Sequence, residues 1–217
     1  MRSWLRRGWP WRGREVAAAT ERWLVLDVET TGLDTHRDQL LAIAAVGLRV
    51  DWTSRRIVLQ LVDSLAITLR PTQVSDKPNI LVHGIGAGVQ RQGMDPGEAL
   101  RTFVQWAAGA RLVAFHASFD RTLLERYARK HLGQPLHCEW LDIAQLCTVS
   151  HPQVKARALD DWLTHFGIQC LARHEATADV MAECDLLQRI WPRVARECSS
   201  WRAVQRYAER HAWLGPR

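Results

Sequence analysis

The sequence predicts an α/β fold: a five-stranded mixed sheet whose first three strands are antiparallel, flanked by helices. Three apolar runs follow one another with short links between residues 23 and 69, which is typical of an antiparallel meander. From residue 95 onward, short apolar runs alternate with segments of helical periodicity. Such alternation favours parallel strands joined by crossover helices. Together the two patterns indicate one mixed sheet.

The first three strands are predicted from their apolar content. Residues 23–26 form a short run of Trp, Leu, Val and Leu, as expected for a buried strand. Residues 40–50 are rich in aliphatic side chains. Residues 57–69 combine partial alternation with β-branched residues, which favour strands.

The fourth element is a helix with a recognisable start. Asp95 is placed as its cap, Pro96 stands in the first turn, and Glu98 follows three residues after the Asp. Apolar residues then recur at helical spacing, and Gly109 is expected to end the helix.

The remaining elements alternate, and residues 1–20 are expected to be an extension. Strands are predicted at 112–115 and 140–143, and helices around 123–127, 158–166, 180–191 and 199–213. We divide the chain into a basic N-terminal Trp/Arg-rich extension (1–20), one main domain (21–195) and a basic C-terminal helix or tail (196–217).

Composition limits the class of protein. Of 217 residues, 47% are hydrophobic and 24% are charged, as in a globular domain. No run of 18 apolar residues occurs, so no membrane helix is expected, and the basic N-terminus is interrupted before a signal-peptide core develops. The five cysteines are odd in number and lack C-x-x-C spacing. We therefore expect reduced thiols and a cytoplasmic location.

The positive charge is concentrated at the two ends of the chain. Residues 1–22 and 191–217 each hold six Arg and two Glu, so the centre carries −2 of the total of +6. This distribution suits a protein that binds a polyanion, although solvated charge explains each end almost as well. The Trp and Arg residues of the first 20 positions suit nucleic acid, the protein's own surface, a partner or a membrane interface, and the sequence leaves these open.

The informative residues are acids beside predicted strands. Asp27 and Glu29 follow the apolar run 23–26, and residues i and i+2 of a strand share a face. Their charges repel each other unless a cation lies between them. Asp120 follows the fourth strand, and Asp179 opens a late helix. His174 precedes Asp179 by five residues, about 140° around a helix, so it is expected on the preceding loop.

These residues lie in motifs that resemble those of the DnaQ-like exonucleases, the DEDDh group. D-V-E-T-T-G-L at 27–33 resembles the first motif, F-D at 119–120 the second, and H-E-A-T-A-D at 174–179 the third. Asp142 and the stretch 158–163 also resemble family positions. The resemblance covers about residues 23–190 and implies a ribonuclease H-like fold with the site at the end of the central strand.

The resemblance also implies roles for the acids and the histidine. Two divalent cations, Mg²⁺ or Mn²⁺, would be held by Asp27, Glu29, Asp120 and Asp179, with Asp27 shared between both ions. Glu29 and Asp179 would hold the ion that binds the attacking water, and Asp120 the other. His174 would be the general base, since imidazole titrates near neutral pH.

Substrate contacts follow from the same resemblance. The turn after the acids, comprising Thr30, Thr31, Gly32 and Leu33, would receive the terminal nucleotide, with His83 in the pocket wall. The second motif departs from the family pattern, which often has His-Asn where this chain has Phe115-His116. His116 is therefore either a substrate contact or a side chain that forms its hydrogen bonds within the protein near the site.

The predicted function is 3′→5′ exonucleolytic hydrolysis of DNA, at single-stranded or frayed ends, releasing nucleoside 5′-monophosphates. Proofreading and repair are the expected settings, with a DNA polymerase as a possible partner and no membrane association. RNA trimming by the same chemistry and a non-catalytic nucleic-acid-binding or polymerase-associated module are the alternatives. The sequence does not assign an oligomeric state.

Overall fold

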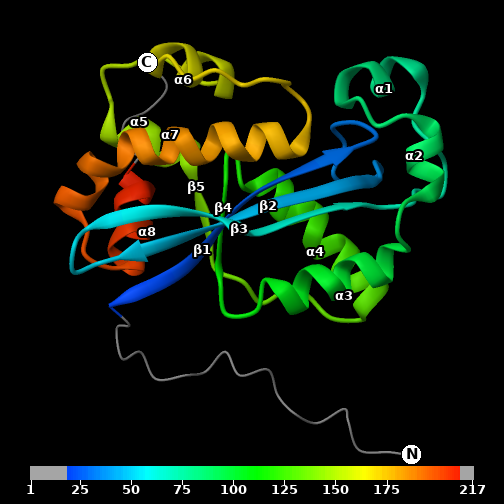
Figure 1. Ribbon diagram of the computed structural model, residues 1–217, viewed down its shortest axis with the longest axis horizontal. Helices are drawn as coiled ribbons and strands as arrows, with labels where there is room; N and C mark the ends of the chain where they lie inside the picture. Colours follow the sequence, from blue (N-terminus) through cyan, green and yellow to red (C-terminus); the bar gives the residue numbers. More distant parts are fainter. Residues whose placement is uncertain (1–18, 211–217) are drawn as a thin grey trace, which may run out of the picture.

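The computed structural model describes residues 19–210, and its centre is a five-stranded sheet in the order β3-β2-β1-β4-β5 (Figure 1). Strand β2 pairs antiparallel with β1 and β3, whereas β4 pairs parallel with β1 and β5. The bounds are β1 Thr20–Thr30, β2 Leu40–Asp51, β3 Arg56–Thr68, β4 Arg111–Ala114 and β5 Trp140–Asp142. The predicted α/β class, the meander and the parallel crossovers are confirmed.

Helices cover both faces of this sheet (Figure 1). One apolar core joins the sheet to α5, α6, α7 and α8, and the other joins it to α3 and α4. The bounds are α1 Lys77–His83, α2 Ala87–Gln92, α3 Pro96–Trp106, α4 Ser118–Leu132, α5 Ile143–Ser150, α6 Leu159–Phe166, α7 Ala176–Glu197 and α8 Trp201–Glu209. In the described part of the chain, no helix is both long and apolar enough to cross a membrane.

Strand β1 is central, and its side chains pack into both apolar cores. Trp23 and Val25 are fully buried against α7 and its neighbours, while Leu24 and Leu26 are fully buried against α3 and α4. Alternate residues of a strand point to opposite faces, so this continuous apolar run is what a strand covered on both sides requires. Because residues 23–26 are buried on both faces of the sheet, the positions of Asp27 and Glu29, which follow them on β1, are fixed.

The end of β1 remote from those acids is packed with indole rings. Trp23 lies edge-on to Trp201, with ring centroids 4.8 Å apart, and to Trp191 at 5.6 Å. Trp52 closes the group, 6.0 Å from Trp23 and 5.9 Å from Trp191. Edge-to-face packing of this kind is favourable beyond the area it buries. This tryptophan cluster ties β1, the end of β2, α7 and α8 together.

Several boundaries differ from the predictions. Strand β1 continues to Thr30, so the acids lie within it rather than after it. Helix α3 is capped by Asp95 as predicted but ends at Trp106, and Gly109 adopts a positive φ in the turn that follows. The boundary predicted at residue 195 falls inside α7. The N-terminal extension proposed for residues 1–20 lies almost wholly outside the described residues.

Three short helices were not predicted. Helices α1 and α2 form a small lobe beyond the end of β1 and the start of β2 (Figure 1), and α5 follows β5 directly. Asp76 caps α1 by accepting the N–H of Asn79, and Asp142 caps α5 by accepting the N–H of Ala144. The predicted C-terminal helix is confirmed as α8.

Candidate active site

The site begins where β1 loses one of its neighbours. Strand β4 pairs with β1 only as far as Val25, whereas β2 continues beside β1 to its end. Asp27 and Glu29 therefore stand on a stretch of strand whose β4 side is open. The two side chains share a face, as their spacing predicted.

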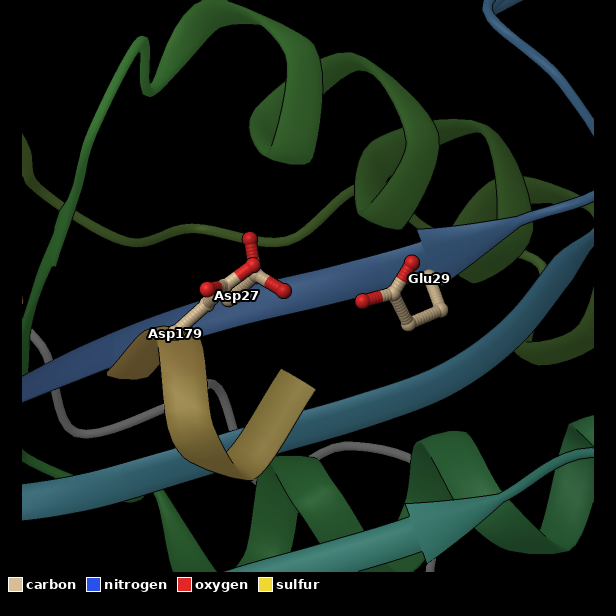
Figure 2. Close-up of side chains that lie close together, drawn as sticks. All are labelled: Asp27, Glu29 and Asp179. Atoms are coloured by element: carbon tan, nitrogen blue, oxygen red, sulfur yellow. The ribbon is translucent and has the colours of Figure 1, made fainter. Parts of the chain in front are cut away.

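Helix α7 brings a third carboxylate to the same place (Figure 2). Asp179 lies in its first turn and is buried, with 5% of its surface exposed. Ligand atoms of Asp27, Glu29 and Asp179 all lie within 4.8 Å of one another. Three carboxylates so close, from two elements far apart in the chain, form a candidate metal site.

Asp120 lies beside this group but is not one of the three within 4.8 Å. It stands in the first turn of α4 and is 4% exposed. Burial raises the pKa of Asp120 to about 8, although backbone N–H groups of Asp120 and Val28 act in the opposite direction. Its charge is the largest electrostatic contribution, after burial, that raises the pKa of Asp27. The charge of Asp120, the fourth predicted acid, therefore affects the ionisation of Asp27 in the site.

The crowding disfavours full ionisation of the acids. Burial raises the pKa of Glu29 to about 8, with a further increase from the neighbouring Asp179 charge. Burial also raises the pKa of Asp27 well above its ordinary range. Such carboxylates either hold protons or share a cation. An all-oxygen donor set fits hard divalent ions such as Mg²⁺ or Mn²⁺.

The sequence analysis missed a fifth carboxylate, that of Glu183. It follows Asp179 by four residues on α7, so it lies on the same face one turn later, and it is 2% exposed. Burial raises its pKa well above the ordinary range, and the charge of Asp120 raises it further. Glu183 accepts a hydrogen bond from the backbone N–H of Phe115 at 3.2 Å. Its position one helical turn after Asp179 was the available signal.

Arg173 was also missed, and it is the cation already present in the site. Its guanidinium donates to Asp179 Oδ1 and to the carboxylate of Asp160. The Arg173 charge lowers the pKa of Glu29, although burial outweighs it. A lone Arg beside the third motif carries no spacing signal, so only the fold reveals this pairing.

His174 lies on the loop before α7, as predicted, and it lines the same cleft as the acids. Its backbone has a φ of 63°, which non-glycine residues adopt rarely. The backbone N–H donates to Asp179 Oδ2 at 3.0 Å, which fixes this conformation. The exposed His174 is thereby tied to one of the acids.

The cleft has a volume of about 560 Å³ and lies between the end of β1, the loop that follows it, and α1. Of the predicted substrate residues, Thr30, Gly32, Leu33 and His83 line it. Leu33 is 89% exposed and projects an apolar surface at this opening. Phe119 of the second motif also lines the cleft, whereas the sequence analysis did not identify the wall residues Asp76, Pro78, Asn79 and Val82.

Thr31 and Gly32 have roles within the loop itself. Thr31 is not among the wall residues, and its carbonyl accepts the side-chain amide of Asn79, which links the loop to α1. A Cβ at Gly32 would lie 2.5 Å from Asp38 Oδ2. The glycine at position 32 therefore makes room for the Asp38 carboxylate within the loop.

The two histidines proposed to contact substrate differ in position. His83 is buried in the wall, where Nδ1 accepts the N–H of Ile85 at 3.0 Å and Nε2 faces Ser75 Oγ at 3.4 Å. His116 is exposed, packs against Phe115, and is not among the residues lining the cleft. Its φ is 58°, and its N–H donates to Asp142 Oδ1 at 3.2 Å.

Sequence comparisons identify related proteins. Residues 24–187 match the RNase_T family model, described as "Exonuclease". The DNA polymerase III subunit epsilon-like protein of Rhodobacter capsulatus is 32% identical over 94% of this chain. DNA polymerase III PolC-type of Caldanaerobacter subterraneus is 27% identical over 80%. The chain spans 29% and 12% of these two relatives, respectively, so it corresponds to a minor part of each.

Solved structures show the same fold. Escherichia coli exonuclease I in complex with a dT13 oligonucleotide has a TM-score of 0.67 and 17% identity. That likeness covers 81% of this chain and 42% of exonuclease I. The zinc-bound complex of the same enzyme with single-stranded DNA has a TM-score of 0.65 and 16% identity. At this level of identity the likeness establishes the architecture.

Proposed function

The chain belongs to the exonuclease family that the RNase_T model describes, the DnaQ-like exonucleases, and we propose that it hydrolyses DNA from the 3′ end at single-stranded or frayed termini. The observation that carries this proposal is the meeting of Asp27, Glu29 and Asp179 within 4.8 Å in an open cleft. The charge of the buried Asp120 acts on Asp27, and His174 lines the same cleft. The products would be nucleoside 5′-monophosphates.

The four acids would hold two divalent cations, Mg²⁺ or Mn²⁺, and the donor chemistry fits them. Asp27, Glu29 and Asp179 offer closely spaced oxygens, and Asp120 adds negative charge beside Asp27. Bound divalent cations would supply Lewis-acid polarisation of the phosphodiester and stabilisation of charge on the departing 3′ oxygen. Carboxylates of raised pKa release protons when a cation binds, so metal affinity would increase with pH.

His174 would accept the proton of the attacking water. Two observations support this proposal: His174 lines the cleft that contains the acids, and its backbone N–H donates to Asp179. Leu33 and Val82, which are 89% and 55% exposed, would contact the terminal base, because apolar surface at a cleft opening suits a nucleobase. The chain's own groups would thereby position the 3′ nucleotide and activate water beside it.

The decisive experiment is digestion of 5′-labelled single-stranded DNA, duplex DNA with a frayed end, and RNA, each with Mg²⁺ or Mn²⁺. A ladder that shortens from the 3′ end, with DNA preferred over RNA, supports the proposal. A preference for RNA would favour the trimming alternative. Binding without digestion of any substrate would favour a non-catalytic module, and the proposed activity would then be wrong.

The setting of this activity is also a proposal. The relatives named as polymerase III epsilon-like and PolC-type support a role in proofreading or repair beside a DNA polymerase. Five free cysteines, three of them buried, are consistent with the cytoplasmic location that we propose. Co-purification with a polymerase catalytic subunit tests the partner.

A further inference from the structure

A second cleft, of about 270 Å³, is lined by residues 37–39, the last part of the loop that follows β1. The catalytic cleft is lined by the first part of the same loop. The second cleft is bounded by that loop, by the connection from β3 to α1, and by α4. We call it the basic cleft because most of its charged side chains are cationic. Its charged or titratable residues are Arg37, Arg70, Arg126, Lys130, His131, Asp38 and Tyr127.

The acid in the basic cleft is already engaged. Asp38 accepts the N–H of Asp34 at 2.7 Å and the hydroxyl of Thr31 at 3.2 Å. Its carboxylate thus holds the loop, and its single negative charge stands against the four cations of the cleft, which leaves the cleft positively charged. Arg126 has a structural role as well, because its guanidinium donates to the carbonyls of His36 and Asp38.

Three cations of the basic cleft face solvent. Arg37 is 89% exposed in its side chain and approaches Asp34 at 3.7 Å, which is a weak surface pair. Arg70, two residues after β3, and Lys130, near the end of α4, are exposed as well. Charges of one sign gathered in a cleft raise the local concentration of a polyanion.

The basic cleft lies close to the candidate active site. Phe119 of α4 lines the catalytic cleft, and Arg126 lines the basic cleft seven residues later. Seven residues of an α-helix span about 10 Å. The loop that follows β1 lines both clefts, and two hydrogen bonds between Thr31 and Gln39, each 2.9 Å long, join its two ends. The loop therefore holds the two clefts at a fixed separation.

We propose that the basic cleft binds backbone phosphates of the substrate strand about three nucleotides on the 5′ side of the scissile linkage, at about 3.4 Å per stacked nucleotide. Arg70 and Lys130 make the contacts, with Arg37 at the edge. Phosphate contacts position a strand without reading its sequence. The inference rests on the proposed function, because it takes the 3′ end to lie among the carboxylates.

The test compares the wild-type protein with the double variant Arg70→Glu/Lys130→Glu. For each, kcat/KM is measured on 5′-labelled oligothymidylates from dinucleotide to octanucleotide. We expect the wild-type value to increase with length until the strand reaches the basic cleft. In the double variant, the ratio of octanucleotide to dinucleotide kcat/KM should fall roughly tenfold, which corresponds to the loss of about 1.4 kcal/mol of binding.

A matched control is Arg56→Glu, because Arg56 is an exposed cation at the start of β3. It pairs with Asp51, which pairs with Thr20 at the end of β1 remote from Asp27. This control should keep the wild-type length dependence. An unchanged length dependence in the double variant would overturn the inference, as would an equal loss in the Arg56→Glu control.

Binding measured without divalent ions separates this inference from the proposed activity. Fluorescence anisotropy of labelled octathymidylate gives the slope of log affinity against log salt concentration. Losing two single-strand phosphate contacts should make the slope less steep by about 1.4. A wild-type protein that digests nothing would refute the activity, whereas an unchanged slope in the double variant would refute the basic cleft as a binding surface.

Discussion

The Glu183 carboxylate on α7 accepts the backbone N–H of Phe115 at 3.2 Å, across the interior between the helix and the end of β4. One residue later, Asp142 Oδ1 accepts the N–H of His116 at the same distance. Two carboxylates therefore hold two consecutive amides of the turn that carries the positive φ of His116. That turn leads directly into α4 and Asp120, so Glu183 fixes the approach of α4 to the site.

Removing this acceptor should destabilise the fold. Glu183→Ala leaves the Phe115 N–H buried without a partner, and we expect the free energy of unfolding to fall by about 1–3 kcal/mol. Glu183→Gln keeps an oxygen acceptor of similar size and should lose less. Urea denaturation of the three proteins measures the difference. Equal losses for Gln and Ala would show that the hydrogen bond contributes little.

The acid cluster should make the metal-free protein less stable as pH rises. Folding raises the pKa of Glu29 and Asp120 to about 8, so the folded state holds protons that the unfolded state has released. The stabilisation is complete below the unfolded pKa of about 4 and is lost as pH increases toward about 8. Thermal unfolding in EDTA should show this fall.

Two further measurements check the origin of that pH dependence. Excess Mg²⁺ should restore stability most strongly near the upper end of the range, because a cation replaces the protons. Asp120→Asn should flatten the profile, whereas Glu98→Gln, at an exposed position on α3, should leave it unchanged. A profile that rises with pH in EDTA would contradict the assignment of the protons to these acids.

Arg173 should compete with metal for Asp179. Its guanidinium occupies Asp179 Oδ1, and its charge opposes an incoming cation. We expect Arg173→Gln to bind Mn²⁺ several-fold more tightly, measured by calorimetric titration at constant pH. Asp160→Asn removes the other partner of Arg173 and serves as the control, with a smaller change. Weaker binding by Arg173→Gln would mean that Arg173 organises Asp179 for metal.

Asp27 and His174 should separate metal binding from proton transfer. Asp27→Asn is expected to lose both Mn²⁺ binding and hydrolysis. His174→Gln should keep Mn²⁺ binding while kcat falls about 10²–10⁴-fold, as when a general base is lost. His165→Gln, an exposed histidine on α6, is the matched control. Full activity in His174→Gln would remove the histidine from the mechanism.

The sequence predicted those parts of the fold whose pattern is local and strong. The run 23–26 is apolar at every position because β1 is covered on both faces, so the central strand was recognisable. Helices α1 and α2 were missed because each is under eight residues long and their segment contains three glycines, at 84, 86 and 88. Short helices stabilised by caps and tertiary contacts lack the periodicity on which the prediction depended.

The site was predictable where spacing alone places side chains together. Asp27 and Glu29 share a face because strand residues alternate, and His174 was placed on a loop by its distance from Asp179. Glu183 follows Asp179 by one helical turn, which indicates a shared face, but only the hydrogen bond from the Phe115 N–H, directly after β4, shows where its carboxylate is buried. The basic cleft brings together residues from three segments, which no single stretch of sequence indicates.

The tryptophan cluster gives the molecule an internal reporter of its tertiary order. Trp23 precedes Asp27 by four residues, so along an extended strand the indoles stand about 13 Å from the first carboxylate. Near-ultraviolet circular dichroism depends on fixed aromatic packing. Its signal should therefore distinguish a variant that is intact but inactive from one that has lost its native packing, without interference from ions or nucleotides at the other end of the strand.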